Sequence, residues 1–420
     1  MKIILDFIIV NISYFIAKRL AVSKKYKSNV SAPIIKIAIV AVAISIVMML
    51  VAVATGVGLQ HVIRDKVSAF GGQIVVAPFD NNDSGITTES FSLDNNLIDK
   101  ITSNQEVKSI FPIATKAGII RTEKTFEGIL YKGVAADYDF SQIQSYLIEG
   151  KTPDFGEKMS NQIVISQYLA NRLEVEIGDK LSTYFLKNNQ QSAPNARGFE
   201  VVGIYRSDFK EFDQTYVIGD LRQVQRLNKW TDDEVGAYEI NLYNIEQLES
   251  TTMQIYEMLP SAINATAISD QFYDIFSWME LFDFNMQIII GIMIIVSVIN
   301  MIVALLVLIL ERSQMIGILK ALGADNWTIR KTFLYSATRI VLRGLFWGNL
   351  IGVGLLLIQK YFNIIKLDAS QYYVEYAPVY FNIWVILAIN LAVVVICYLV
   401  LIIPSYLVAK ISPVKVIKFQ

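Results

Sequence analysis

The sequence is poor in the side chains on which many enzymes depend. Its 420 residues include one histidine, His61, and one cysteine, Cys397. A histidine-based catalytic triad and a multi-histidine metal site are therefore unsupported, and a single cysteine excludes an intrachain disulfide. Charged residues make up 18% of the chain, below the share of about a quarter that is usual for soluble proteins. This shortage of charge directs attention to membrane-spanning segments.

Motifs for nucleotide and ester cleavage are also missing. The sequence has no Gly-x-x-x-x-Gly-Lys-Ser/Thr phosphate-binding loop and no Gly-x-Ser-x-Gly nucleophile turn. The formal net charge is −1, so no strong positive field favours nucleic acid. We therefore predict that the chain is not an enzyme by itself. We also predict no catalytic, cofactor-binding or metal-binding residues, and no nucleic-acid partner.

Long apolar runs dominate what is present. A helix that crosses a membrane needs about 20 mostly apolar residues, and 54% of this chain is hydrophobic. The N-terminal residues, 1–36, are predicted to include an interfacial helix at the cytoplasmic leaflet. We predict four transmembrane helices, at residues 37–60, 284–310, 332–358 and 379–407.

Lysine and arginine predict the orientation of these helices, because they are enriched in short cytoplasmic segments. They are concentrated before the first helix, between the second and third, and in the tail at residues 408–420. Both termini and residues 311–331 are therefore predicted to be cytoplasmic. Residues 61–283 and the short loop at 359–378 are predicted to lie outside.

The segment at residues 61–283 mixes two hydrophobic periodicities. Residues 161–173 and 245–259 read as helices, and residues 187–198 form a polar loop between two strand-like runs. The fold class is therefore a membrane protein with four transmembrane α-helices and a large α+β extracytoplasmic domain. Runs rich in Val, Ile, Tyr and Phe predict strands at residues 73–77, 126–134, 199–205, 214–218 and 238–242.

A stripe of small residues occupies one face of the third predicted helix. Gly344, Gly348 and Gly352 recur every four residues, a spacing that lets helix backbones approach closely in lipid. The stripe fits either packing within one subunit or a seam between two subunits, and the sequence alone does not choose.

The predicted cytoplasmic segment at residues 311–331 carries its own signals. Ile316, Leu319 and Leu322 give an apolar stripe at helical spacing, and Lys320, Arg330 and Lys331 are placed to meet phosphates or acidic side chains. Gly323 is suited to end a helix, and Asp325 is suited to cap the next one.

Here the sequence resembles the FtsX-like/MacB-like ABC transporter permeases, and within them the lipoprotein-releasing LolC/LolE family. The resemblance rests first on Glu311-Arg312 followed by Gly317-Ile-Leu-Lys-Ala-Leu-Gly-Ala324. It is extended by Tyr14-Phe-Ile-Ala-Lys-Arg-Leu20, Thr55-Gly-Val-Gly-Leu-Gln60 and Pro413-Val-Lys-Val-Ile417. It implies a multi-pass permease of the cell inner membrane. A separate cytoplasmic ATPase dimer would bind ATP, and its closure would move the extracytoplasmic domain by mechanotransmission.

The resemblance also implies partners and sites. The partners are a second copy of the permease or a paralogue, an acylated lipoprotein and a periplasmic carrier. The porter part maps to residues 61–135 and 236–283, and a distal insert maps to 136–235. The ATPase would dock on Glu311, Arg312, Ile316, Leu319, Lys320, Leu322, Gly323 and Trp327. Acyl chains would enter at Val53, Val57, Ile288 and Ile292. The carrier would bind Asn188, Gln191, Pro194 and Arg197, although this loop is shorter than the family's and has one proline.

Two other functions remain open from the residues. A MacB-type efflux permease is one, although such chains typically carry their own ATPase. An FtsX-like regulator of a cell-wall hydrolase is the other, although such proteins usually have a smaller outer domain.

Overall fold

The computed structural model describes residues 31–406 apart from 83–85, 88 and 186–193. Its chain divides into two compact units. The sheet unit consists of Gln60–Met279 and Leu367–Glu375. The helix unit consists of the described residues up to Leu59, Glu280–Lys366 and the described residues from Tyr376 onwards.

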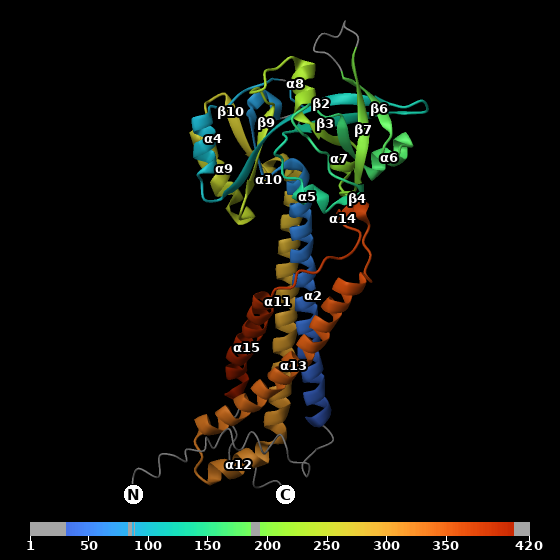
Figure 1. Cartoon of the computed structure of the whole chain (residues 1–420). Coiled ribbons are helices and arrows are strands. Elements are labelled where there is room, and N and C mark those ends of the chain that lie inside the picture. The colour runs from blue at the N-terminus through green and yellow to red at the C-terminus, as the bar shows by residue number, and fades with distance from the viewer. Residues whose placement is uncertain (1–30, 83–85, 88, 186–193, 407–420) are drawn as a thin grey trace, which may run out of the picture. The chain divides into compact units, whose positions relative to one another are not determined.

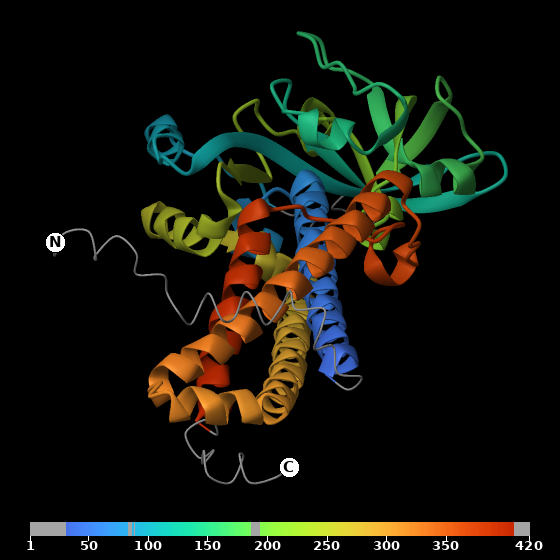
Figure 2. The ribbon, with the colours of Figure 1, turned by 90° about the horizontal axis from the view of Figure 1, so that it is seen from below.

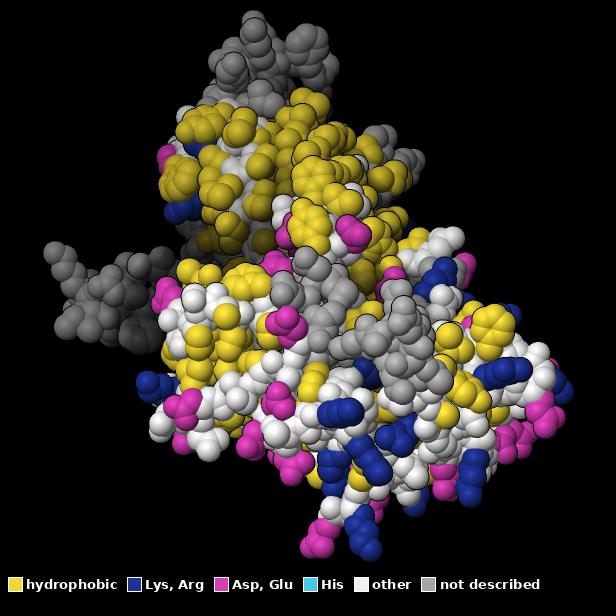
Figure 3. Space-filling view, turned by 90° about the horizontal axis from the view of Figure 1, so that it is seen from above, with side chains coloured by type: hydrophobic (Ala, Val, Ile, Leu, Met, Phe, Trp, Pro, Cys, Tyr) yellow, Lys and Arg dark blue, Asp and Glu magenta, His cyan; other side chains and the backbone are white. Residues whose placement is uncertain are grey.

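Helices that are long and apolar enough to cross a membrane build the helix unit, as the sequence predicted, and two of them extend into the sheet unit. There are four in the described part of the chain: α2 (Ser31–Gly71), α11 (Tyr273–Glu311), α13 (Asn326–Phe362) and α15 (Ile383–Ser405). The short helix α12 (Ser313–Ala321) follows α11 (Figures 1 and 2). Apolar side chains cover the surface of this unit, whereas charged side chains are scattered over the sheet unit (Figure 3).

The glycine stripe of α13 faces α2 in the same chain. A Cβ atom on Gly344 would lie 2.6 Å from Val42 Cγ1, and one on Gly348 would lie 2.8 Å from Ile46 Cβ. One on Gly352 would lie 3.0 Å from Leu50 Cδ1. The stripe is therefore used for packing within one subunit, because the absent side chains let the two backbones meet.

A polar pair joins α13 to α15. Asn349 Nδ2 donates to Asn390 Oδ1 at 2.6 Å, and Asn390 Nδ2 donates back to Asn349 Oδ1 at 2.9 Å. Each amide also donates to a backbone carbonyl four residues earlier in its own helix. Inside an apolar bundle such a reciprocal pair fixes the register of the two helices.

The sheet unit is built on one ten-stranded mixed sheet in the order β10-β1-β9-β2-β3-β8-β5-β7-β4, with β6 paired to β2 and β7. The β3–β8 and β5–β7 pairs are parallel, and the other pairs are antiparallel. The strands are β1 (Ile74–Pro78), β2 (Val107–Arg121), β3 (Phe126–Val134), β4 (Leu147–Gly150), β5 (Gln162–Ser166), β6 (Lys180–Phe185), β7 (Asn195–Tyr205), β8 (Tyr216–Asp220), β9 (Ala237–Leu242) and β10 (Ile263–Ala267).

Helices cover and connect these strands. Helix α9 (Leu248–Met258) contacts β10, and α4 (Asn95–Thr102) contacts β2. The sheet-unit helices are α3 (Phe79–Asn82), α4 (Asn95–Thr102), α5 (Ser141–Gln144), α6 (Gln167–Leu173), α7 (Lys210–Asp213), α8 (Leu221–Asn228), the 3-10 helix η2 (Ile245–Gln247), α9 (Leu248–Met258), α10 (Ile268–Gln271) and α14 (Ala369–Tyr372).

The sequence predicts some of these elements and misplaces others. The predicted strands fall on β1, β3, β7, β8 and β9, and the helix predicted at 245–259 is present as η2 and α9. The helix predicted at residues 161–173 is wrong in its first part, because β5 occupies Gln162–Ser166. Ser166 ends that strand and caps α6, with its Oγ accepting from Leu169 N at 3.0 Å. A cap inside the predicted helix was the overlooked signal.

The two halves of the sheet come from different parts of the chain. Strands from residues 61–135 and 236–283 stand together as β10-β1-β9-β2-β3, and strands from residues 136–235 follow as β8-β5-β7-β4. The parallel β3–β8 ladder and the β2–β6 pairing join the halves into one sheet. Backbone hydrogen bonds therefore connect the two halves directly.

Candidate functional site

The turn between α11 and α13 forms as the sequence predicts. Helix α12 ends before Gly323, whose φ of +90° is costly for any residue with a Cβ. Asp325 then caps α13, with its Oδ2 accepting from Trp327 N at 3.0 Å and from Thr328 N at 3.1 Å. The Thr328 hydroxyl also donates to Asp325 Oδ1. This hydrogen bond first, and then those from the backbone, favour the charged carboxylate and lower the pKa of Asp325. The direction of α12 is thus fixed by local backbone geometry.

The apolar residues of this turn divide into buried and exposed groups. Ile316 is fully buried in the core of the helix unit, and Leu319 is partly buried against that core. Leu322 and Trp327 are 79% and 51% exposed. The predicted stripe therefore does not form one exposed face. The structure adds Ile318, which is 48% exposed and was overlooked because it lies one residue off the predicted stripe.

The charged residues of the turn also differ in their surroundings. Glu311, Arg312 and Lys320 are half-buried, and burial lowers the pKa of Lys320. Arg330 is buried between two aromatic rings, 3.7 Å from the ring centroid of Tyr406 and 5.3 Å from that of Trp327. Its Nε also donates to Ser405 Oγ at 3.1 Å. Arg330 thus connects the end of α15 to the start of α13. Its guanidinium is buried and is not accessible to a phosphate or an acidic partner.

Among the described residues, Val53 and Val57 line a small pocket to which the other two predicted acyl-chain residues do not contribute. Val53 and Val57 line a pocket of about 20 Å³, whose other wall comes from Tyr380 and from α15 residues such as Ile389. Ile288 and Ile292 are 43% and 49% exposed on α11, and they do not line this pocket. The contribution of α15 was not foreseen, because nothing in the local sequence links it to α2.

The predicted carrier loop is shorter than its sequence suggests. Strand β7 begins at Asn195, so Arg197 belongs to the ladder and pairs with Thr183 of β6. Pro194 is exposed next to this ladder. Asn188 and Gln191 lie outside the described residues. The predicted boundary at Gly198 is wrong, because the polar run Asn195–Gly198 forms backbone pairs despite its low strand propensity.

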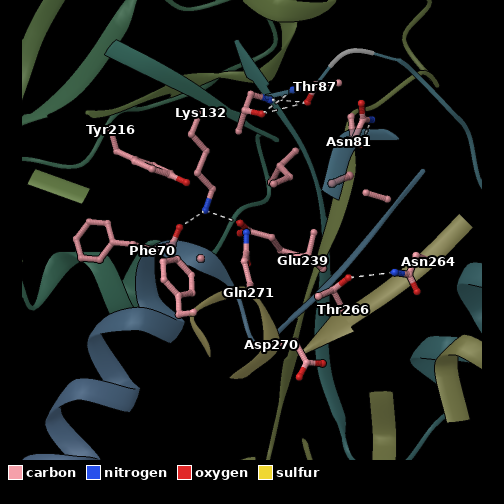
Figure 4. A pocket seen from close by; sticks show the side chains of 18 residues that line it. Phe70, Asn81, Thr87, Lys132, Tyr216, Glu239, Asn264, Thr266, Asp270 and Gln271 are labelled. Carbon is pink, nitrogen blue, oxygen red and sulfur yellow. Dashed lines mark hydrogen bonds and ion pairs between the residues drawn. The ribbon is translucent and has the colours of Figure 1, made fainter. Parts of the chain in front are cut away.

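A cavity of about 560 Å³ opens on the sheet unit beside the C-terminal end of α2 (Figure 4). Lys132 of β3 and Glu239 of β9 form an ion pair in its wall, with 2.5 Å between Lys132 Nζ and Glu239 Oε1. Both side chains are at most 3% exposed. Lys132 Nζ also donates to the carbonyl oxygen of Phe70, near the end of α2, at 2.6 Å. A cation at a helix C-terminus is favoured by the helix dipole.

Tyrosines surround this buried pair. Tyr138 Oη donates to Glu239 Oε2 at 3.3 Å, and burial together with the charge of Glu239 raises the pKa of Tyr138 well above its usual range. The same two causes raise the pKa of Tyr216 to about 12. Both tyrosines therefore stay neutral near neutral pH. Sequence reasoning missed the pair, although a lysine within the apolar run from Ile129 to Val134 was a visible signal.

Comparison with known proteins covers both units. The sequence model of the MacB-like periplasmic core domain matches residues 37–273, more than half of the chain, and that of the FtsX-like permease C-terminal matches residues 287–413. The lipoprotein-releasing system transmembrane protein LolE of Haemophilus influenzae is 21% identical over 335 residues, which are 77% of this chain and 80% of that protein. LolC of the same organism is 25% identical over 284 residues, 59% of this chain and 70% of that protein.

Among solved structures, the periplasmic region of MacB from Actinobacillus actinomycetemcomitans aligns with 50% of this chain and 94% of its own length, at 12% identity and a TM-score of 0.33. The match to the MacB-like periplasmic core domain spans most of the sheet unit, and the FtsX-like match spans α13 and α15. The chain therefore belongs to the FtsX-like/MacB-like permease family of ABC transporters.

Proposed function

We propose that this chain is the permease subunit of a transporter that extracts lipoproteins from the inner membrane and hands them to a periplasmic carrier. The observation that carries the proposal is the similarity to LolE, which extends over 77% of this chain and therefore includes both units. A separate ATPase dimer would supply the energy and hold the ATP. A second permease, either a copy or a paralogue, would complete the complex.

The exposed apolar side chains between α11 and α13, in the segment from α12 to Trp327 that we call the α12 turn, support an ATPase docking site there. Ile318, Leu322 and Trp327 give large exposed apolar groups, and exposed apolar groups near charged residues are typical of protein interfaces. Ile316 and Leu319 would act indirectly, because they seat α12 on the core of the helix unit. In this proposal the α12 turn and both termini face the cytoplasm, and the sheet unit faces the periplasm.

The pairing of β6 with β7 supports a carrier site at the tip of that hairpin. A six-residue ladder gives the hairpin a firm base, and loops on a firm base often bind partners. Val53 and Val57 on α2 and Ile288 and Ile292 on α11 would contact acyl chains, with a second permease supplying the rest of the acyl-binding wall. None of these roles requires a cofactor on this chain.

The experiment is ATP-dependent release from proteoliposomes that hold this chain, its second permease and the ATPase. We expect an acylated lipoprotein to be released to a soluble carrier, and the same protein without acyl chains to remain behind. Efflux of small peptides with no lipoprotein release would favour a MacB-type exporter. Activation of a cell-wall hydrolase with no cargo movement would favour an FtsX-like regulator.

A further inference from the structure

The segment Leu367–Glu375, which links α13 to α15 along the chain, folds as part of the sheet unit. Its ends are tied together by a hydrogen bond from Leu367 N to the Glu375 carbonyl oxygen at 2.8 Å. Helix α14 (Ala369–Tyr372) lies between these ends, next to β4 in the view of Figure 1. We call Leu367–Glu375 the clasp segment.

Tyr373 is the centre of the clasp segment. Its ring stacks on Phe209, with the centroids 4.2 Å apart and the planes at 18°. The ring of Trp278, from α11, stands nearly perpendicular to the Tyr373 ring, with the centroids 6.0 Å apart and the planes at 80°. The Tyr373 carbonyl oxygen accepts a hydrogen bond from Lys66 Nζ of α2 at 2.9 Å. One residue therefore contacts the distal insert and the two helices that continue from the helix unit.

Charges reinforce this contact. Lys66 Nζ lies 2.9 Å from Asp208 Oδ2, with the side chains 8% and 15% exposed. Asp208 Oδ1 also lies 3.3 Å from Arg206 Nε, and Arg206 Nη2 lies 3.0 Å from Glu375 Oε1. The chain of pairs thus runs from α2 through the distal insert to the end of the clasp segment. Its buried members cannot separate without leaving an uncompensated charge.

The backbone at this contact includes one conformation that is uncommon for its residue. Tyr373 has a φ of +59°, in the left-handed region that bulky residues avoid, whereas Asp208, with a φ of +60°, is of a type that adopts this region more readily. The Asp208 turn is fixed by Asp213, whose Oδ2 accepts from Asp208 N at 3.0 Å and whose Oδ1 accepts from Ser207 N at 2.9 Å. The unfavourable backbone conformation of Tyr373 is kept only where surrounding contacts enforce it.

The clasp segment differs from the other connections between the helix unit and the sheet unit, because it is not part of a continuous helix. Helices α2 and α11 run without a break between the helix unit and the sheet unit. Helix α13 instead ends at Phe362 and α15 begins at Ile383. The clasp segment is the part of their connecting chain that packs in the sheet unit.

We propose that the clasp segment is a joint that stays closed during transport and carries movement of α13 and α15 to the distal insert. Lys66, Arg206, Asp208 and Glu375 are positioning residues in it, because they act on the sheet unit and touch no cargo. This inference rests on the proposed transport function. Weakening the joint should therefore separate ATP hydrolysis from cargo release without unfolding the chain.

The test uses the half-exposed pair Arg206–Glu375, whose side chains are 42% and 39% exposed and therefore tolerate charge reversal. Glu375→Arg places a second cation beside Arg206, and Arg206→Glu places an anion between Glu375 and Asp208. In reconstituted complexes we expect each change to lower the lipoprotein released per ATP hydrolysed by about fivefold, with hydrolysis unchanged. The double reversal should restore part of the release, since it rebuilds the 206–375 pair with opposite signs, while the anion at position 206 still lies beside Asp208.

The matched control reverses another ion pair of the sheet unit. Arg172 Nη2 lies 2.8 Å from Glu127 Oε1, between α6 and β3. Arg172→Glu and Glu127→Arg should leave release per ATP unchanged. Release at the wild-type ratio in both Arg206→Glu and Glu375→Arg would overturn the proposal. So would an equal fall in the control variants, because the effect would then be general destabilisation.

A second measurement needs no cargo and separates this proposal from the proposed transport function. Hydrogen exchange of the sheet unit is compared with and without ATP in the full complex. We expect ATP to change protection in the distal insert of the wild type and of the double reversal, but not of Glu375→Arg. A wild type that shows this change and releases no lipoprotein would contradict the transport function alone. An equal change in Glu375→Arg would contradict the joint.

Discussion

The two ends of helix α2 pack against their neighbours with different chemistry. Around Val42 and Ile46, α2 meets the glycine face of α13, and the contact consists of backbone and apolar side chains. At Lys66 and Phe70, in the sheet unit, the same helix is held by buried ion pairs and hydrogen bonds. One continuous helix thus changes its mode of attachment along its length.

The difference follows from the surrounding solvent. In a bilayer, apolar burial gives helices little reason to associate, so close backbone packing is what stabilises the contact. In an aqueous domain, a buried charge is tolerated when a partner compensates it, and removing one partner is costly. The contact of α2 with the glycines of α13 depends on shape, and its contact around Lys66 and Phe70 depends on charge balance. Substitutions can test each contact separately.

The largest effect is expected from breaking the charge balance at the end of α2. Lys132→Met would leave Glu239 buried without its cation, at a cost of about 3–5 kcal/mol in the free energy of unfolding. Pulse proteolysis of the sheet unit in the full-length, detergent-solubilised chain measures this change. The double variant Lys132→Met/Glu239→Gln should recover most of the loss, because it removes both charges. A single variant as stable as the wild type would mean that water compensates Glu239.

Filling the glycine contact should have the next largest effect. At Gly348 a Cβ atom would lie 2.8 Å from Ile46 Cβ and 2.9 Å from the Ala43 carbonyl oxygen, which belongs to a backbone that cannot easily move. Gly348→Leu is therefore expected to cost about 3 kcal/mol by overpacking, measured as unfolding by steric trapping in bicelles. Gly354 of the same helix has open space around its α-carbon in the described structure. If Gly354→Leu destabilises the bundle equally, packing against α2 is not the cause.

The glycine contact of α2 could be predicted from the sequence more readily than its charged contact around Lys66. Gly344, Gly348 and Gly352 repeat at the helical period, and the apolar runs around them are local signals. Lys66 and Asp208 are 142 residues apart, and neither position is distinctive in sequence. Strand β2 was also missed, because its pairing with β3, β6 and β9 comes from tertiary contacts. The Gly323 and Asp325 turn was predicted because helix ends have local rules.

A smaller effect should come from the amide pair in the helix unit, which combines features of both contacts. Asn349→Ala removes two hydrogen bonds to Asn390, and we expect a loss of about 1 kcal/mol, as is typical of hydrogen bonds between membrane helices. Adding Asn390→Ala should cost little more, because the pair is already broken. Asn300→Ala serves as a control, since the Asn300 amide donates to Val296 in its own helix. Additive losses at Asn349 and Asn390 would contradict coupling between them.

The smallest effect on stability is expected at Leu322, directly after α12, where neither kind of contact operates. Leu322 is 79% exposed, so Leu322→Asp should change the free energy of unfolding by less than about 0.5 kcal/mol, as for other surface changes. If the ATPase docks there, co-purification of the ATPase should nevertheless fall, because the new charge would be buried in an apolar contact. Ile316→Asp is the matched comparison, since Ile316 is fully buried in the core of the helix unit. It should lower the amount of chain in the membrane as well as the bound ATPase. A Leu322→Asp variant that retains its ATPase, at a normal membrane level, would move the docking surface away from this turn.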